Sequence, residues 1–370
     1  MTERHRNRLL LACFFIVLTA IPLQADDVDD YVKAVMQQRH IPAASVAVIK
    51  DGVLIKAAGY GLADMEHGIP ANSETIYKIG SLSKQFLAAG VMLLVQDGKV
   101  SVDDKVNQHL PGIPSTWQDI TLRHLLTHTS GLVREGPSFD PYKVQPVIDV
   151  ITSAYTLPLL FKPGEKYTYS NLGYYLLAEV IQRVSAKPWD VFLHERIFAP
   201  LGMTSTRVTT VADIVSNRAD GYIWSEDKFT NAENWPAVRP SGAFLSTVLD
   251  IAKWETALQT DRILTASTRA QMWTPLVLSN GDKYPYGFGW ELDDFPPGGY
   301  VTGVPSIRHE GTIPGFRAAF TRLPKQGLAI VVLSNLDRAA LDSIIAGIAV
   351  RFAPELLPAA LQRWQESSLK

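Results

Sequence analysis

The sequence predicts an α+β fold, in which both ends of the chain build one sheet domain and the middle forms an inserted, mostly helical domain. Strand patterns with a period of two occur near both ends, at 44–58 and 318–333, whereas the pattern between 98 and 254 is mainly helical. Strands and helices segregated in this way are typical of the α+β class. The predicted parts are a signal peptide at 1–25, a discontinuous sheet domain at 26–97 and 255–370, and a mostly helical domain at 98–254.

The individual elements follow from local patterns. Helical apolar spacing predicts a helix at 31–38, and the strand patterns at 44–49 and 54–58 flank Asp51-Gly52, a dipeptide typical of a hairpin turn. The next helix starts at or near Ser81. Further predicted elements are helices at 122–126, 174–184 and 248–258, strands at 318–323 and 328–333 around the turn 324–327, and a closing helix at 337–352.

Composition limits the classes of function. The chain has 370 residues, of which 46% are hydrophobic and 19% are charged, as in an ordinary globular protein with ample core. A formal net charge of −2 indicates neither a nucleic-acid footprint nor a polybasic membrane patch. We therefore expect a small-molecule or peptide partner and no nucleic acid.

The N-terminus predicts the compartment. Three arginines among the first eight residues precede the apolar run 9–18, and Ala25 offers a small residue before Asp26 where a signal peptidase could cut. We expect a periplasmic or secreted protein with no stable membrane span after signal removal; a retained membrane anchor is the alternative. Cys13 is the only cysteine and lies in this segment, so the mature chain has no disulfide, catalytic thiol or cysteine-ligated metal.

Ser81 and Lys84 form the first candidate catalytic pair. A serine and a lysine three residues apart at a helix start lie on one face, where the amine can remove the hydroxyl proton. The helix N-terminus favours negative charge on the serine oxygen. Alone, the pattern also fits a solvated helix cap beside a surface charge.

Tyr169 and Asn171 form a second candidate. In an extended loop, side chains separated by one residue point to the same side. A phenol next to a lysine ammonium can have its pKa lowered enough to exchange protons, and an amide can orient a substrate amide. The alternative is a tyrosine-rich helix start packed in the core, with Asn171 as its N-cap.

His309 and Gly311 mark a third candidate, just before a predicted strand pair. A glycine beside a polar residue on an edge strand lets a ligand approach the backbone. The alternative is a plain turn with a solvated histidine.

Together these patterns resemble the serine β-lactamase and penicillin-binding-protein superfamily, whose first signature is S-x-x-K. The resemblance is closest to the branch of class C β-lactamases, D-alanyl-D-alanine carboxypeptidases and related esterases, with Y-x-N at 169–171 and H-x-G at 309–311 as second and third motifs. It spans roughly 30–350 and includes the family-like stretches 121–132 and 200–203. It implies a β-lactamase/transpeptidase-like fold, with an antiparallel sheet flanked by helices and the active site in a cleft beside the inserted domain.

The resemblance also implies roles. Ser81 would attack a carbonyl carbon, and Lys84 and Tyr169 would move protons. The N–H groups of Ser81 and Thr312 would form the oxyanion hole. Among the substrate-binding residues, Asn171 would orient the substrate amide, and His309 would stand where many relatives carry a lysine that helps to bind a carboxylate.

The third motif departs from the β-lactamase pattern. A histidine is a weaker carboxylate anchor than a lysine because it is only partly charged at neutral pH, and Glu310 adds a negative charge where relatives usually have threonine, serine or glycine. Arg308 and Arg317 could compensate for that charge. We therefore expect a peptidase or esterase rather than an efficient β-lactamase; a class C-type β-lactamase and a non-enzymatic penicillin-binding sensor or silent regulatory relative are the alternatives.

Competing sites are disfavoured. His124 and His128 are spaced i, i+4 as in some zinc sites, but no acidic general base lies between them in the metalloprotease order. The tryptophans are scattered, which favours core packing over carbohydrate stacking, and no G-x-S-x-G surrounds any serine. We therefore expect no metal site and no cofactor.

Overall fold

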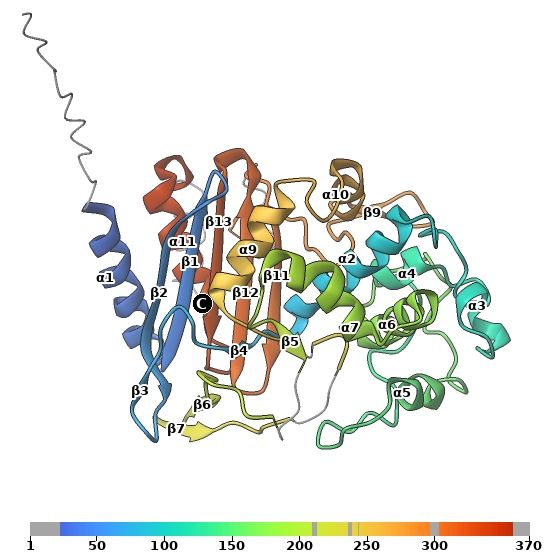
Figure 1. Cartoon of the computed structure of the whole chain (residues 1–370), viewed down its shortest axis with the longest axis horizontal. Helices are drawn as coiled ribbons and strands as arrows, with labels where there is room; N and C mark the ends of the chain where they lie inside the picture. Colours follow the sequence, from blue (N-terminus) through green and yellow to red (C-terminus); the bar gives the residue numbers. More distant parts are fainter. Residues whose placement is uncertain (1–22, 209–212, 236–238, 243, 297–302, 358–370) are drawn as a thin grey trace, which may run out of the picture.

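The computed structural model describes residues 23–208, 213–235, 239–242, 244–296 and 303–357, and its centre is a six-stranded antiparallel sheet (Figure 1). The strand order is β11-β12-β13-β1-β2-β3, so hairpins from the two ends of the chain meet where β1 pairs with β13. This confirms the predicted α+β fold. The strands are β1 (Ala43–Lys50), β2 (Val53–Asp64), β3 (Ile69–Pro70), β11 (Ile307–Ile313), β12 (Phe316–Leu323) and β13 (Leu328–Ser334).

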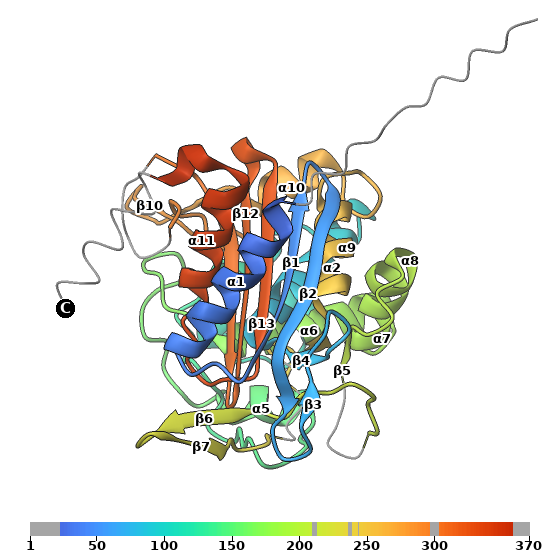
Figure 2. The same cartoon turned by 90° about the vertical axis from the view of Figure 1, so that its left-hand side faces the viewer.

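Helices cover both faces of this sheet. Figure 2 shows α1 (Leu23–Gln38) and α11 (Leu341–Phe352) side by side on one face. On the other face, α9 (Val248–Leu258) packs against β1, β2 and β13, and α2 (Ser83–Gln96) belongs to the same apolar core. Alternation along β1 supplies both cores, because successive side chains of a strand point to opposite faces.

A mostly helical part lies beside the sheet, centred on the packing of α2 against α6 (Asn171–Ser185). Its other helices are α3 (Val106–His109), α4 (Leu122–Leu126), α5 (Val147–Ser153), α7 (Trp189–Leu193) and α8 (Ala199–Leu201), with α10 (Ala266–Met272) nearby. Short strands form three smaller sheets: β4 (Tyr77–Lys78), β5 (Arg207–Val208) and β8 (Phe244–Ser246); β6 (Tyr222–Ser225) and β7 (Lys228–Asn231); β9 (Leu276–Val277) and β10 (Lys283–Tyr284).

Two predictions from the sequence concern where the helical domain and the signal peptide end. The domain boundary placed between 254 and 255 falls within α9, a helix that packs on the sheet. Residues 1–22, which hold most of the predicted signal peptide, lie outside the described residues. Across the part of the chain that the structure describes, no helix combines the length and apolar composition that a membrane span requires.

Candidate active site

Ser81 and Lys84 lie together at the start of α2. Ser81 sits in a 3₁₀ turn, Gly80–Leu82, that leads directly into the α-helix, and the Ser83 hydroxyl donates to the Gly80 carbonyl (2.7 Å). This tight turn brings Lys84 Nζ to 3.1 Å from Ser81 Oγ. The amine is therefore within hydrogen-bond reach of the hydroxyl.

The Lys84 amine is fully buried and has two further acceptors. Nζ donates to Asn171 Oδ1 and to the Ser241 carbonyl, each at 2.8 Å. Burial, reinforced by the positive charges of Arg239 and Arg134, holds the pKa of Lys84 well below its usual range, against the attraction of Glu135. A lysine in this environment loses its proton at a lower pH than a free lysine and can act as a base.

Tyr169 and Asn171 reach the same lysine from the loop that opens α6. Ser170, rather than Asn171, is the N-cap of this helix, because its hydroxyl accepts from Gly173 N–H (3.1 Å). The Asn171 side chain is thus free to contact Lys84 and donates its amide N–H to Glu135. The Tyr169 ring centroid lies 4.7 Å from Lys84 Nζ.

The phenol of Tyr169 differs from the expectation based on its lysine neighbour. Burial raises its pKa, and a hydrogen bond with Ser81 opposes this shift only in part. The desolvation cost of the phenolate outweighs the nearby positive charge. Tyr169 is accordingly a neutral phenol, suited to donating a proton.

Strand β11 packs backbone against backbone on the Ser81 turn. A Cβ on Gly311 would lie 1.9 Å from the Ile79 carbonyl oxygen and 3.1 Å from Ser81 N, and a Cβ on Gly80 would lie 2.7 Å from Thr312 N. Only glycine fits positions this close to backbone atoms. The close packing brings the backbones of Ser81 and Thr312, two residues that line the same cleft, near one another.

These residues border a cleft of about 480 Å³. Ser81, Asn171 and Thr312 line it, whereas Lys84, Tyr169, His309 and Gly311 are not among its lining residues. The lining also carries both signs of charge, which the sequence patterns did not reveal because the residues come from loops far apart in the chain. These charged residues are Arg134, Glu135, Glu233, Arg239, Asp337 and Arg338.

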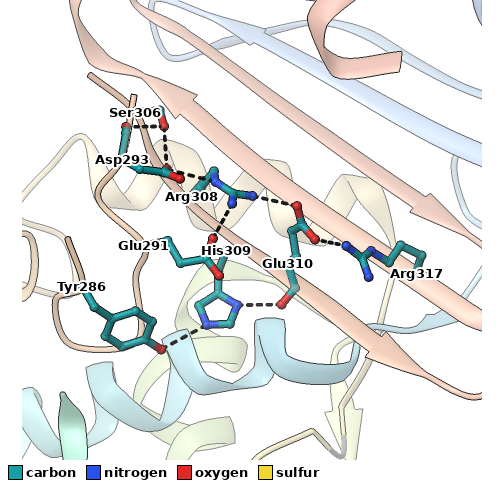
Figure 3. A network of polar contacts seen from close by, with 8 residues as sticks. All are labelled: Tyr286, Glu291, Asp293, Ser306, Arg308, His309, Glu310 and Arg317. Carbon is teal, nitrogen blue, oxygen red and sulfur yellow. Dashed lines mark hydrogen bonds and ion pairs between the residues drawn. The ribbon is translucent and has the colours of Figure 1, made fainter. Parts of the chain in front are cut away.

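His309 is buried and does not line the cleft, and Figure 3 shows its ring between Tyr286 and the backbone of Glu310. Its Nδ1 lies 2.6 Å from the Glu310 carbonyl oxygen and its Nε2 lies 3.1 Å from the Tyr286 hydroxyl. Burial, together with the charge of Lys84, lowers the pKa of His309 to about 3. A neutral imidazole with both nitrogens occupied is not placed to hold a substrate carboxylate.

The Glu310 carboxylate is not among the groups that line the cleft and belongs to an ionic network with Arg308 and Arg317 (Figure 3). Arg308 donates to one carboxylate oxygen (2.7 Å) and Arg317 to the other. Arg308 also binds Glu291 (2.7 Å) and Asp293 (3.1 Å). The two arginines flanking the third motif therefore neutralise Glu310, leaving it no direct role in repelling a substrate.

The two histidines spaced i, i+4 make separate hydrogen bonds. His128 is buried and its Nδ1 accepts from Ser170 N–H (3.1 Å), whereas His124 Nδ1 accepts from Thr121 N–H (3.2 Å). Within the described ranges, no group of three His, Cys, Asp or Glu side chains is placed to hold a metal ion.

Comparisons with known proteins agree with this architecture. Residues 28–353 match the model of the family described as Beta-lactamase. Penicillin-binding protein 4* of Bacillus subtilis (strain 168) is 30% identical over 81% of this chain and 69% of its own length. Protein flp of Staphylococcus aureus (strain N315) is 26% identical over 84% of this chain, which spans 63% of that relative.

Solved structures share the fold. The octameric penicillin-binding protein homologue from Pyrococcus abyssi has a TM-score of 0.76 and 26% identity, covering 88% of this chain and 76% of its own. The D-amino acid amidase from Ochrobactrum anthropi SV3, solved with D-phenylalanine, has a TM-score of 0.76 and 24% identity, covering 90% and 99% of the two chains.

Proposed function

This chain belongs to the β-lactamase family, within the serine β-lactamase and penicillin-binding-protein superfamily of serine hydrolases, and from that membership we propose that it cleaves an amide or ester through an acyl-enzyme on Ser81. The observation that carries the proposal is the buried Lys84 amine, which lies 3.1 Å from Ser81 Oγ and has a lowered pKa. A weak nucleophile such as serine needs an adjacent base of this kind.

The proposed acylation moves one proton at each step. As Ser81 Oγ bonds to the carbonyl carbon, its proton passes to Lys84 and the carbonyl electron pair moves onto oxygen. When the bond to the leaving group breaks, that group takes the Tyr169 proton, and Lys84 then returns a proton to Tyr169. Water releases the acyl group by the same steps in reverse.

The negative oxygen needs donors in that step. The N–H groups of Ser81 and Thr312, brought together by the contact of β11 with the Ser81 turn, would supply them. Each such donor contributes about 3 kcal/mol to the transition state. Asn171, which lines the cleft beside Lys84, would orient the substrate amide.

A peptide or ester substrate is favoured over efficient β-lactam hydrolysis. The third motif offers the cleft no lysine, and its histidine is buried and neutral. The cleft instead presents both signs of charge, which suits a peptide with polar ends. The N-terminal pattern of residues 1–25 supports secretion or a periplasmic location, and N-terminal sequencing of the mature protein tests that part.

Turnover of a short-chain aryl ester, a chromogenic β-lactam and a D-alanyl-D-alanine peptide tests the proposal, with Ser81→Ala as the control and intact mass to detect acylation. We expect turnover of the ester or peptide that Ser81→Ala abolishes. A β-lactam as best substrate would indicate the class C-type alternative. A persistent Ser81 adduct without product would indicate a sensor. The absence of both an adduct and turnover would refute the proposal.

A further inference from the structure

A chain of four hydrogen bonds runs behind the reactive groups, through three side chains that do not line the cleft: His128, Tyr286 and His309. Ser170 N–H donates to His128 Nδ1 (3.1 Å), and His128 Nε2 lies 3.2 Å from Tyr286 Oη. Tyr286 Oη lies 3.1 Å from His309 Nε2, and His309 Nδ1 lies 2.6 Å from the Glu310 carbonyl oxygen. All three side chains are at most 2% exposed.

The backbone groups at the two ends of this hydrogen-bond chain determine which nitrogen of each neutral imidazole carries the proton. A backbone N–H only donates, so His128 Nδ1 must be the unprotonated nitrogen and Nε2 must carry the proton. A backbone carbonyl only accepts, so His309 carries its proton on Nδ1 and its Nε2 accepts from the Tyr286 hydroxyl. Since burial keeps both rings neutral, the hydroxyl accepts from His128 and donates to His309, and it also interacts by hydrogen bonding with Tyr174.

The two ends of the hydrogen-bond chain lie beside the two segments that hold the reactive groups, the loop that carries Tyr169 and strand β11. The His128 ring packs on the Tyr169 ring with centroids 4.1 Å apart, and its own carbonyl accepts from Thr168 N–H (2.9 Å). His128 also holds a left-handed conformation with φ of 59°. At the other end, His309 lies on β11 two residues before Gly311.

We propose that His128, Tyr286 and His309 are positioning residues that hold the Tyr169 loop at a set distance from β11, and so from the donors beside Ser81. This inference rests on the proposed function. It also distinguishes histidine from lysine at position 309, because an ammonium only donates and cannot accept from Tyr286.

The groups around His128 and His309 keep both imidazoles neutral. Burial lowers the pKa of both histidines, and positive groups face them from other elements: Lys84 on α2 and Arg134 in the loop between α4 and α5, with Arg308 on β11 itself. Other titratable neighbours are the phenols of Tyr167, Tyr169 and Tyr174 and the carboxyl groups of Glu291 and Glu310.

Kinetics of matched variants test the inference on the substrate that the wild type turns over best. His309→Gln keeps an oxygen that can accept from Tyr286, whereas His309→Lys has none, and Tyr286→Phe removes both central bonds. We expect kcat to fall about tenfold to a hundredfold in His309→Lys and Tyr286→Phe, and His309→Gln to retain most of it, with smaller changes in KM.

Tyr175→Phe is the matched control, because the Tyr175 hydroxyl is buried and has no hydrogen-bond partner among the described residues. It should leave kcat unchanged. Circular dichroism and thermal melting check that each variant folds. Wild-type kcat in Tyr286→Phe, or higher activity of His309→Lys on a carboxylate-bearing substrate, would overturn the inference.

A second readout does not depend on activity. Long-range ¹⁵N–¹H spectra of the wild type at pH 7, assigned through single histidine variants, should show His128 protonated at Nε2 and His309 at Nδ1. The opposite tautomer in either ring would refute the proposed hydrogen-bond chain. If the wild type shows no Ser81-dependent turnover, the proposed function is refuted. The tautomers of His128 and His309 then still decide whether the proposed hydrogen-bond chain exists.

Discussion

Lys84 shows how burial converts an ordinary residue into a candidate base. Its amine has three hydrogen-bond acceptors but no carboxylate in direct contact, so its ammonium form gains too little to offset desolvation. We expect kcat/KM for the Ser81 reaction to rise with pH along an acid limb well below pH 10.5, the ordinary value for lysine.

The isosteric change Glu135→Gln tests that assignment. The Glu135 carboxylate attracts the Lys84 ammonium, so its removal should move the acid limb to lower pH, while the amide oxygen of the new side chain can still accept from the Asn171 amide. A pH–rate profile of both proteins measures this shift. An unmoved limb would mean that Lys84 is not the group that titrates.

Glu291 illustrates burial acting in the opposite direction. Burial raises the pKa of Glu291 to about 7. The attraction of Arg308 opposes this shift, but Arg308 also binds Glu310 and Asp293, which repel a negative charge on Glu291. Arg308 stays charged among these carboxylates.

A carboxyl whose pKa is raised on folding contributes stability below its unfolded pKa, near 4.5, and loses that contribution as the pH rises through 7. We expect the free energy of unfolding to decrease between pH 5 and 8 more steeply in the wild type than in Glu291→Gln. Urea titrations at several pH values measure both slopes. Equal slopes would contradict the raised pKa.

The contact between β11 and the Ser81 turn is the element-scale feature on which the site depends. Gly311→Ala would place a methyl group 1.9 Å from the Ile79 carbonyl oxygen, so β11 must move away from the turn and carry Thr312 N with it. We expect kcat to fall about a hundredfold or more, as for the loss of an oxyanion donor, together with lower stability.

Gly173→Ala provides the control for this change, because a Cβ there meets nothing closer than 3.6 Å and lies within α6. Its activity and melting temperature should match those of the wild type or slightly exceed them, since alanine favours a helix. Equal activity of the two alanine variants would show that close packing of β11 is not needed.

Elements with a local start signal could be predicted closely from the sequence. The helix predicted at 248–258 coincides with α9, where the Thr247 hydroxyl accepts from Asp250 N–H (3.1 Å). The last α-helix of the described residues begins at Leu341 rather than at residue 337, because Arg338 has a left-handed backbone (φ of 55°) and Asp337 N–H donates to the Tyr222 carbonyl (2.9 Å). That contact joins segments more than a hundred residues apart, and no local pattern reveals it.

The candidate site divides in the same way. Ser81, Lys84, Tyr169 and Asn171 could be selected because each pair is close in sequence and forms a known motif. Glu135 and Arg239, which face the cleft from loops, carry no periodic signal and become visible only when folding brings them together. The burial of His309 likewise depends on Tyr286, which approaches from another segment.

The whole molecule is held together partly by an ion pair buried between the sheet and its covering helices. Arg322 on β12 donates to Glu255 on α9 at 2.6 Å, and their side chains are only 8% and 2% exposed. The guanidinium also lies 4.3 Å from the Trp273 ring, beyond the end of α10. Strand β12, helix α9 and the segment after α10 therefore meet at Arg322.

A double-mutant cycle measures what this ion pair contributes. Glu255→Met or Arg322→Met alone leaves a buried charge without its partner and should lower the free energy of unfolding by about 3–5 kcal/mol. The double variant should recover much of that loss, because breaking a buried pair costs more than replacing it with apolar side chains. Denaturant titration of all four proteins gives the coupling energy.

The exposed pair Lys105–Asp119, with a comparable separation of 2.9 Å and exposures of 51% and 65%, serves as the reference. Asp119→Asn should change stability by less than about 1 kcal/mol, because solvent screens both charges. If the buried single variants cost no more than this exposed one, water must reach Arg322, and the joint between sheet and helices would depend on the apolar core alone.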